Sequence, residues 1–322
     1  MNHQKFRFIT YELVLFLLLA AFVITIGLIN PAFFSVGTLF DVIRNQTIFL
    51  LLALGVLPVA ILGGFDISYP AVASITTFFA RVILTNLDYD GGIWLFYLVS
   101  ILFAIGMGML IGWMIWAFKL SFFDLSLGVT NLITGFMVLI SSVIHGRGRL
   151  PALSGWNMRW LVTVQAVVGR SGLHVSFIVV VLASIGMHLF LRYTVPGRSI
   201  YALGSDKSVA IRTGFDTKKI YMTAFALLGS MASIAAVTGS GLGAGSFSEK
   251  YMKVYAMVII GGASIRGGRG TVLGTILGVL LVGLINQAMV YLRIPNAWWD
   301  ALLGVLFILF TTYQTLETRL NE

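Results

Sequence analysis

The sequence contains no cysteine and very little charge. The absence of cysteine among its 322 residues excludes disulfides and thiolate metal sites within the chain. Only 10% of the residues are charged, whereas 58% are hydrophobic and the mean hydropathy is +0.97. Soluble domains carry about 25% charged residues, so this composition excludes one. Only lipid covers so much apolar surface, and we predict an all-α polytopic membrane protein with a single transmembrane domain, residues 1–322.

Acidic residues are scarcer than basic ones. The chain has 12 acidic and 21 basic residues, which gives a formal net charge of +9. Such an excess also occurs in nucleic-acid-binding proteins, but here the lysines and arginines lie between apolar runs. Membrane topology and contact with anionic lipid headgroups explain that distribution. We therefore expect membrane lipid as a partner and no nucleic acid.

Residues that support catalysis are also few. The four histidines are scattered, and no metal-ligand spacing, nucleophile motif or carboxylate pair occurs. The string GGASIRGGRG at 261–270 resembles a phosphate-binding loop, but no lysine–serine pair follows it and apolar runs flank it. We predict a tight cytoplasmic turn there, no bound cofactor or metal, and no catalytic residues.

The apolar runs predict about ten transmembrane helices with both termini in the cytoplasm. Most of the runs approach the ~20 residues that cross a bilayer. The predicted spans are residues 11–29, 47–62, 71–84, 93–118, 124–144, 173–193, 221–238, 254–265, 271–291 and 301–313. Residues 31–46 are predicted to form a separate interfacial helix. In this orientation most basic residues fall inside, although the arginine-rich segment 145–172 falls outside.

Two glycine-rich interruptions lie inside apolar runs, one in each half of the chain. They are GGFDIS at 63–68 and GGASIR at 261–266. Irregular backbone at membrane depth occurs only where protein or a water-filled cavity satisfies it, so both predict broken or re-entrant helices. Asp66 has two interpretations. It either lines the transport path or pins the break by accepting backbone N–H groups, and the short motif favours the pin.

Two predicted spans carry hydrogen-bonding side chains without charge. Asn131 lies in 124–144 among serines and threonines, and Asn286 and Gln287 lie near the outer end of 271–291. Uncharged amides and hydroxyls suit a polyhydroxylated solute, and they also join helices to one another. The candidate substrate-path residues are therefore Asp66, Asn131, Asn286 and Gln287.

The longest polar run between two apolar segments is TVPGRSIYALGSDKSVAIRTGFDTKKI, residues 194–220. Its basic excess indicates the cytoplasmic side. We expect Pro196 to end the preceding span, Ser205 or Asp206 to cap a short helix through Arg212, and Gly214 to stop that helix. A short helix displayed on the cytoplasmic face is a docking surface. The alternative interpretation is an ordinary solvated loop.

This run resembles the cytoplasmic coupling loop of ribose-type ABC importer permeases, whose pattern is T-x-x-G-R-x-x-Y-A-x-G-x-(N/D)-x-x-A-A-R-x-x-G-(I/F). The matching residues are Thr194, Gly197, Arg198, Tyr201, Ala202, Gly204, Ala210, Arg212 and Gly214. GGFDIS is similar to the family's G-G-I-D-L-S, and residues 259–287 resemble its I-G-G-x-S-x-x-G-G-x-G-x-x-x-G-T-x-x-G segment. The resemblance covers most of the chain and is specific in combination.

The resemblance implies a permease of the bacterial inner membrane. Its implied partners are two cytoplasmic ATPase subunits that use ATP, a second identical or similar permease, and a periplasmic solute-binding protein. The resemblance places ATPase coupling in residues 194–219. The candidate coupling residues are Gly197, Arg198, Asp206, Ala210, Arg212 and Gly214. Gly214 is expected to set the turn, while Arg198 and Arg212 pair with the ATPase or fix the loop.

Two segments depart from the family pattern. Residues 120–128 lack the proline of I-P-x-F-I-x-T-L-G and gain Asp124, and residues 250–257 lack the acidic pair of Y-E-L-D-A-I-A-A. Substrate contacts therefore do not carry over at either place.

The solute itself stays open at this stage. The family favours a pentose, a hexose or a related polyol. The stretch YLRIPNAWWD at 291–300 looks like that of autoinducer-2 permeases, which makes a furanosyl signal molecule a rival. The alternative of a different class is an ion-coupled secondary transporter, for which Asp66, Asp124 and Asp300 are the acidic candidates.

Overall fold

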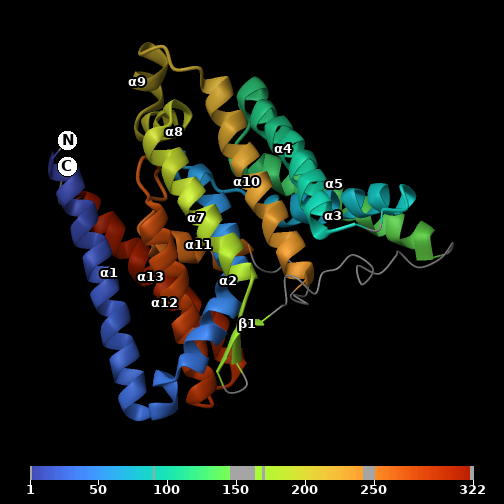
Figure 1. The fold of residues 1–322 in the computed structure, drawn as a ribbon. Coiled ribbons are helices and arrows are strands. Elements are labelled where there is room, and N and C mark those ends of the chain that lie inside the picture. Colours follow the sequence, from blue (N-terminus) through green and yellow to red (C-terminus); the bar gives the residue numbers. More distant parts are fainter. Residues whose placement is uncertain (1, 90, 146–163, 169–170, 242–250, 320–322) are drawn as a thin grey trace.

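The computed structural model of the chain is a bundle of helices (Figure 1). It describes residues 2–89, 91–145, 164–168, 171–241 and 251–319. The helices are α1 (Asn2–Ile29), η1 (Pro31–Phe34), α2 (Val36–Ile61), α3 (Tyr69–Asn86), α4 (Ile93–Phe118), α5 (Phe122–His145), α7 (Ser176–Tyr193), α8 (Val195–Ser205), α9 (Lys207–Arg212), α10 (Thr217–Gly241), α11 (Tyr251–Ile260), α12 (Val272–Tyr291), η3 (Asn296–Trp298) and α13 (Trp299–Arg319). The strands are β1 (Val164–Val168) and β2 (Ser171–His174).

Within the described residues, eight helices are long and apolar enough to cross a membrane. They are the helices α1, α2, α4, α5, α7, α10, α12 and the segment from η3 through α13. This confirms an α-helical polytopic membrane protein. The two remaining predicted spans correspond to α3 and to the ten-residue α11, which do not meet the same criterion. The total of ten spans and the cytoplasmic side of the termini therefore stay predictions.

The prediction of a separate interfacial helix at 31–46 is wrong. Ser35 caps α2 by accepting the N–H of Thr38, and the helix continues unbroken through Ile61. Val42 and Gln46 are buried within the protein, because this half of α2 packs against α12. A face covered by protein needs no lipid interface, so the helix does not bend into the membrane surface.

A small β-hairpin accompanies the helices. Strands β1 and β2 pair antiparallel, within and just beyond the segment 145–172 that was predicted as an external loop. The sequence analysis did not predict this hairpin. Residues 146–163 of the same loop lie outside the described residues, and the side on which the loop lies stays a prediction.

Helix α2 is the centre of the bundle. In its most apolar 18-residue stretch 78% of the residues are buried, against 17% in α5 and 11% in the segment that includes α13. It contacts α10, α12, α7 and α11. The outer helices expose rows of leucine, isoleucine and phenylalanine, the surface that lipid covers. Figure 1 shows α13 and α5 on opposite flanks of the bundle.

Helices α4 and α10 pack backbone to backbone and run antiparallel. A Cβ atom on Gly108 would overlap the carbonyl oxygen of Phe225, and one on Gly112 would lie 2.6 Å from that of Tyr221. Gly229 approaches the carbonyl of Ala104 in the same way. Small residues at every fourth position permit this contact, which is how membrane helices associate without a hydrophobic driving force.

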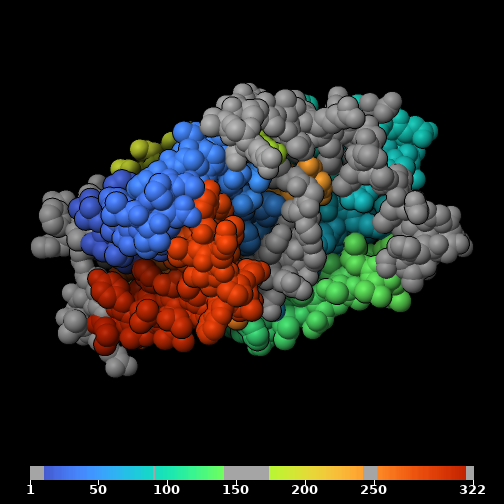
Figure 2. Space-filling view, turned by 90° about the horizontal axis from the view of Figure 1, so that it is seen from below, coloured from blue at the N-terminus to red at the C-terminus, as the bar shows by residue number. Residues whose placement is uncertain are grey.

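At the end of the bundle opposite α9, the start of α2 and the end of α12 lie side by side (Figure 2). The hydroxyl oxygens of Thr38 and Tyr291 are 2.6 Å apart, and Phe33 meets the Tyr291 ring edge to face at 5.6 Å. At the other end lie α8, α9 and the first turns of α1 (Figure 1). The short helices of the candidate coupling segment are therefore displayed at one end of the bundle.

Candidate functional site

The candidate coupling segment begins with a sharp reversal between α7 and α8. Thr194 donates its hydroxyl to Phe190 O at 2.7 Å and accepts the N–H of Gly197 at 3.1 Å. A Cβ on Gly197 would overlap Phe190 O, so the reversal requires glycine. Helix α7 ends at Tyr193, where the predicted span ends ahead of Pro196, and Pro196 itself lies in the first turn of α8, where proline is tolerated.

Helix α9 has the two ends that the sequence predicted. Asp206 caps it by accepting the N–H groups of Ser208 and Val209 at 2.8 and 3.0 Å, and these bonds lower the pKa of Asp206 below its usual value. Gly214 ends it with φ +83°, while Phe215 N–H donates to Ala210 O at 3.1 Å. A six-residue helix is too short to be stable alone, so these ends define it.

The predicted coupling residues divide into two groups. Arg198, Asp206, Arg212 and Gly214 are exposed, whereas Gly197 and Ala210 are buried. Ala210 faces the hydrophobic core, so it anchors α9 and presents no surface to a partner.

The sequence analysis missed three apolar residues on this segment. Val209, Ile211 and Phe215 are 51%, 54% and 38% exposed. The signal for these residues is the stretch KSVAIRTGF, which mixes apolar and basic residues. A six-residue helix cannot bury all the apolar residues of this stretch.

The inner face of α8 contacts two other segments through backbone atoms. A Cβ on Gly204 would overlap Ile61 O at the end of α2, and Gly268 donates its N–H to the same oxygen at 2.7 Å. Tyr201 donates its hydroxyl to Gly270 O at 2.8 Å. We call this meeting of residues 61–64, 201–205 and 266–270 the glycine junction. In the sequence, Gly204 stands out only as a residue that matches the family pattern. No local pattern predicts its contact, because the contact joins residues more than 60 positions apart.

Both helix breaks enter the glycine junction, and both begin in the same way. Gly63 has φ +74° and Gly262 has φ +94°. The residue after each glycine donates its N–H five positions back, Gly64 to Val59 O and Ala263 to Val258 O. This is the Schellman termination that glycine permits. The predicted breaks are confirmed, and the structural equivalent of Gly63 is Gly262.

Asp66 lies in the first break and is fully buried. Its carboxylate accepts the N–H of Ser68 at 2.8 Å and the Ser68 hydroxyl at 2.9 Å, while its own N–H donates to the Tyr255 hydroxyl at 2.7 Å. A neighbouring cavity lined by Ser68 and Tyr69 has a volume of about 10 Å³, room for at most one water. The side chain thus hydrogen-bonds to the backbone of the break in which it lies.

The other substrate-path candidates do not gather into one site. Asn131 is exposed on α5, where the adjacent Thr130 donates to Ile67 O at 3.2 Å. Asn286 and Gln287 are half-buried near the end of α12. Helix α5 contacts α3 and α4, whereas α12 contacts α1, α2 and α11. Among the described residues, no cluster of three or more acidic or histidine side chains forms a metal site.

Comparison with known proteins assigns the family. A family model described as "Branched-chain amino acid transport system / permease component" matches residues 38–311. The autoinducer 2 import system permease protein LsrC of Yersinia enterocolitica is 29% identical over 296 residues, which cover 88% of this chain and 76% of that protein. LsrC of Enterobacter sp. strain 638 is 29% identical over 319 residues, which cover 92% and 86% of the two chains.

A further relative, LsrC of Yersinia pseudotuberculosis, is 28% identical over 300 residues, 88% of this chain and 78% of that protein. No solved structure matches. The apolar helices and the family match agree on a multi-pass protein of the bacterial inner membrane. The chain belongs to the family of permease components of branched-chain amino acid transport systems, in agreement with its resemblance to ABC importer permeases.

Proposed function

We propose that this chain is the permease of an ATP-driven importer for a small polyhydroxylated solute, and that its ATPase subunits act on α8 and α9. One observation carries the proposal. The segment from 194 to 219 exposes an apolar and basic surface on one side and contacts both helix breaks through backbone atoms on the other.

The exposed side has the composition of a protein-docking surface. Val209, Ile211 and Phe215 supply apolar area beyond the membrane-spanning helices, and Arg198 and Arg212 lie exposed on the same segment. Protein interfaces combine an apolar centre with a polar rim in this way. Exposed apolar residues on a polar loop also favour a partner over the alternative of a solvated loop.

The buried side transmits movement. Gly204 and Ile61 touch without any side chain between them, and Tyr201 is hydrogen-bonded to the turn before α12. A displacement of α9 by the ATPases therefore displaces α8, and with it the ends of α2 and α11. The coupling requires that the ATPases contact this segment differently in their two states. The fully buried Asp66 holds the first break in one shape in this scheme.

The solute path is proposed to run beside α5. Asn131 is an uncharged amide exposed on a membrane-spanning helix, where contact with lipid is unfavourable and a second permease or a watery path is favourable. Asn286 and Gln287 then lie near the entrance to which a solute-binding protein delivers. Hydroxyl-bearing solutes match amides, and the names of the relatives favour the furanosyl signal autoinducer 2 over a pentose or hexose.

The coupling site is tested by co-purification from the native host in a mild detergent. We expect a stoichiometric ATPase subunit with the wild-type chain and its loss from the Arg212→Glu variant. The matched control is Arg293→Glu, an exposed charge reversal in the turn after α12, which should retain the ATPase. A clean homo-oligomer that transports alone under an ion gradient would overturn the proposal.

The solute is tested by uptake into cells that lack their own copy of the gene. Labelled autoinducer 2, a labelled pentose and a labelled hexose are each offered alone and together with an excess of the other two on the order of 100-fold. An excess of this order saturates a single site. Saturable uptake of autoinducer 2 that resists the sugars supports the signal molecule. Saturable uptake of a sugar supports the carbohydrate type, and saturable uptake of none of the three contradicts the solute class.

A further inference from the structure

We infer that the outer face of α4 binds one anionic phospholipid, with its headgroup on Lys119 and Lys218 and an acyl chain over Gly106. The observations are a basic end of this helix, two interfacial tryptophans and an apolar hollow on the same face. Lys218 lies at the end of the segment 194–219 but is not one of the candidate coupling residues, and none of the other features belongs to that segment or to the substrate path.

The basic end is formed where α4 ends and α10 begins. Lys119 ends α4 in the left-handed conformation with φ +52°, and Lys218 lies in the first turn of α10. Both side chains are exposed. Among the described residues no carboxylate lies within ion-pair distance of either lysine, whereas the neighbouring Lys219 pairs with Asp216 at 3.4 Å. Two positive charges are therefore available to an anion.

Two tryptophans, Trp113 and Trp116, lie beside the basic end of α4. The Nζ of Lys218 lies 5.4 Å from the centre of the Trp116 ring, which holds the ammonium group over the aromatic face. Trp113 and Trp116 are 38% and 40% exposed. Tryptophans that expose part of a ring near a helix end lie at the headgroup level of a bilayer. The lysines consequently lie at or above that level, where phosphate groups are found.

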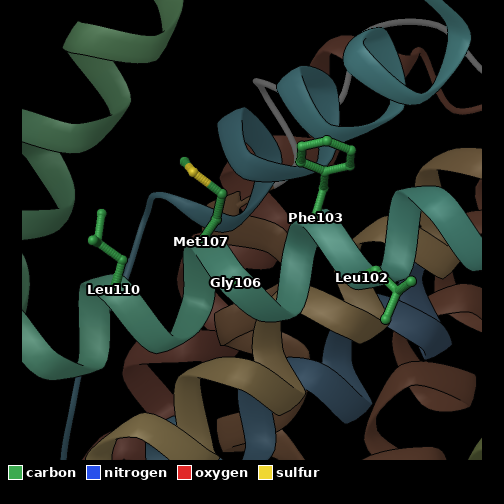
Figure 3. Close-up of a pocket in the computed structure, with 5 residues that line it drawn as sticks. All are labelled: Leu102, Phe103, Gly106, Met107 and Leu110. Carbon is green, nitrogen blue, oxygen red and sulfur yellow. The ribbon is translucent and has the colours of Figure 1, made fainter. Parts of the chain in front are cut away.

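The apolar hollow is lined by α4 alone (Figure 3). It has a volume of about 440 Å³ and is lined by Leu102, Phe103, Gly106, Met107 and Leu110. Figure 3 shows Phe103, Met107 and Leu110 standing beside the bare backbone of Gly106. A Cβ on Gly106 would meet nothing within 4 Å, unlike Gly108 and Gly112, which touch α10. The hollow thus exists because residue 106 has no side chain.

The three features share one face and have the spacing of a lipid. Residues 102, 106, 109, 113 and 116 recur at the helical period, so they lie along one stripe. Gly106 is about 15 Å from Trp116 along the helix axis, by the rise of 1.5 Å per residue. The hydrocarbon of one leaflet is also about 15 Å deep, half of the ~30 Å core. A lipid whose headgroup contacts the two lysines therefore has the end of its acyl chain at the hollow.

An anionic phospholipid fits this face better than another protein helix does. An apolar helix would fill the hollow but leave Lys119 and Lys218 without counter-charge, and a zwitterionic lipid would bring its own cation to them. The available charge therefore selects the lipid class, since each basic residue near an anionic surface contributes a separate attraction.

The headgroup contact is tested by native mass spectrometry of the full chain released from nanodiscs that hold equal phosphatidylglycerol and phosphatidylcholine. We expect the wild type to retain phosphatidylglycerol. The double variant Lys119→Gln/Lys218→Gln should retain roughly 25-fold less, about fivefold for each lysine. The control Lys219→Gln removes a lysine that already has a carboxylate partner and should change nothing. Equal retention of the two lipids by the wild type would overturn the proposal.

The acyl-chain contact is tested with Gly106→Leu, which fills the hollow and leaves both lysines in place. Its control is Gly186→Leu on α7, another glycine whose added Cβ meets nothing within 4 Å. We expect phosphatidylglycerol retention to fall in the first variant and to stay at the wild-type level in the second. Unchanged retention in Gly106→Leu, with normal folding, would contradict the assignment of the hollow.

Discussion

The two short helices of the coupling segment follow each other directly and lie in different surroundings. Helix α8 buries Gly197, Ser199, Ile200 and Leu203, whereas α9 buries Ala210 alone. In the proposed function, this contrast allows one loop between membrane helices both to belong to the bundle and to present a surface to a partner. One helix anchors the segment to the bundle, and the other displays a surface that needs only its two capped ends.

The stability of each helix accordingly has a different origin. Helix α8 depends on contacts with residues far away in the sequence, at the glycine junction. Helix α9 depends on its own Asp206 cap, its Gly214 end and the buried Ala210. A substitution in α8 should therefore affect the whole bundle, whereas one in α9 should affect only that helix and the partner bound to it.

The largest effect is expected for Gly204→Ala. Its new Cβ overlaps a backbone carbonyl, so α8 must move away from α2 at a cost of about 3 kcal/mol, at the upper end for overpacked sites. Thermal unfolding of the purified protein measures it, with Gly186→Ala as the open-space control. Equal unfolding temperatures in the two variants would show that α8 is not held at the glycine junction.

The next effect is expected for Gly214→Ala. No atom lies within 4 Å of the new Cβ, but φ +83° is strained for alanine by about 1–2 kcal/mol. Because the strain falls on the end of α9, we expect normal amounts in the membrane and loss of uptake. Gly214→Asn should restore part of the uptake, since asparagine tolerates this conformation better. Normal uptake by the alanine variant would remove α9 from the coupling surface.

A smaller effect is expected for Tyr201→Phe. The ring stays in place while Gly270 O loses its donor, which costs about 1 kcal/mol. Thermal unfolding should report this loss, and uptake should fall because the turn before α12 is released. The control is Tyr193→Phe, an exposed tyrosine at the end of α7. An unfolding temperature equal to that of this control would mean that water replaces the missing donor.

The smallest effect is expected for Asp206→Ala, because the exposed cap that it removes stabilises α9 alone. Hydrogen exchange of the α9 amides should accelerate while that of α8 stays unchanged.

The cap also has a pH dependence of known sign. The N–H groups of Val209 and Ser208 hold the pKa of Asp206 below 3.8, its usual value. Because its pKa is lowered, the carboxylate stabilises the folded state at pH values above the usual pKa. That contribution disappears as the pH falls through the lowered pKa. Exchange in α9 should therefore accelerate below about pH 4 in the wild type and show no such step in Asp206→Asn. A step of equal size in both would assign it to another group, such as Asp216.

Local signals predicted the boundaries that depend on neighbouring residues. The cap at Asp206, the stop at Gly214 and the break after Ile61 follow from side-chain oxygens and glycine conformations within a few residues, and each is found. The separate interfacial helix failed for the opposite reason. Gln46 at the end of this stretch is buried by α12, and no pattern within 31–46 reports a helix more than 200 residues away.

The predicted functional residues show the same division. Arg198 and Arg212 are exposed, as a loop charge must be, but Ala210 is buried and Val209 and Ile211 are exposed. Helical periodicity cannot assign faces over six residues, because such a helix has fewer than two turns. The neighbouring tryptophans divide in the same way, since Trp298 is exposed and Trp299 is buried.

The sequence by itself determined that this protein lies in a membrane and where its helices break, and it predicted which segment couples to a partner. Composition, glycine conformation and capping are properties of short stretches, and folding does not change them. The tertiary structure alone decided that Gly204, Ile61 and Gly268 meet, that the N–H of Asp66 donates to the Tyr255 hydroxyl and that Gln46 is buried against α12. Those features arise from contacts between distant segments, which depend on how the helices are arranged.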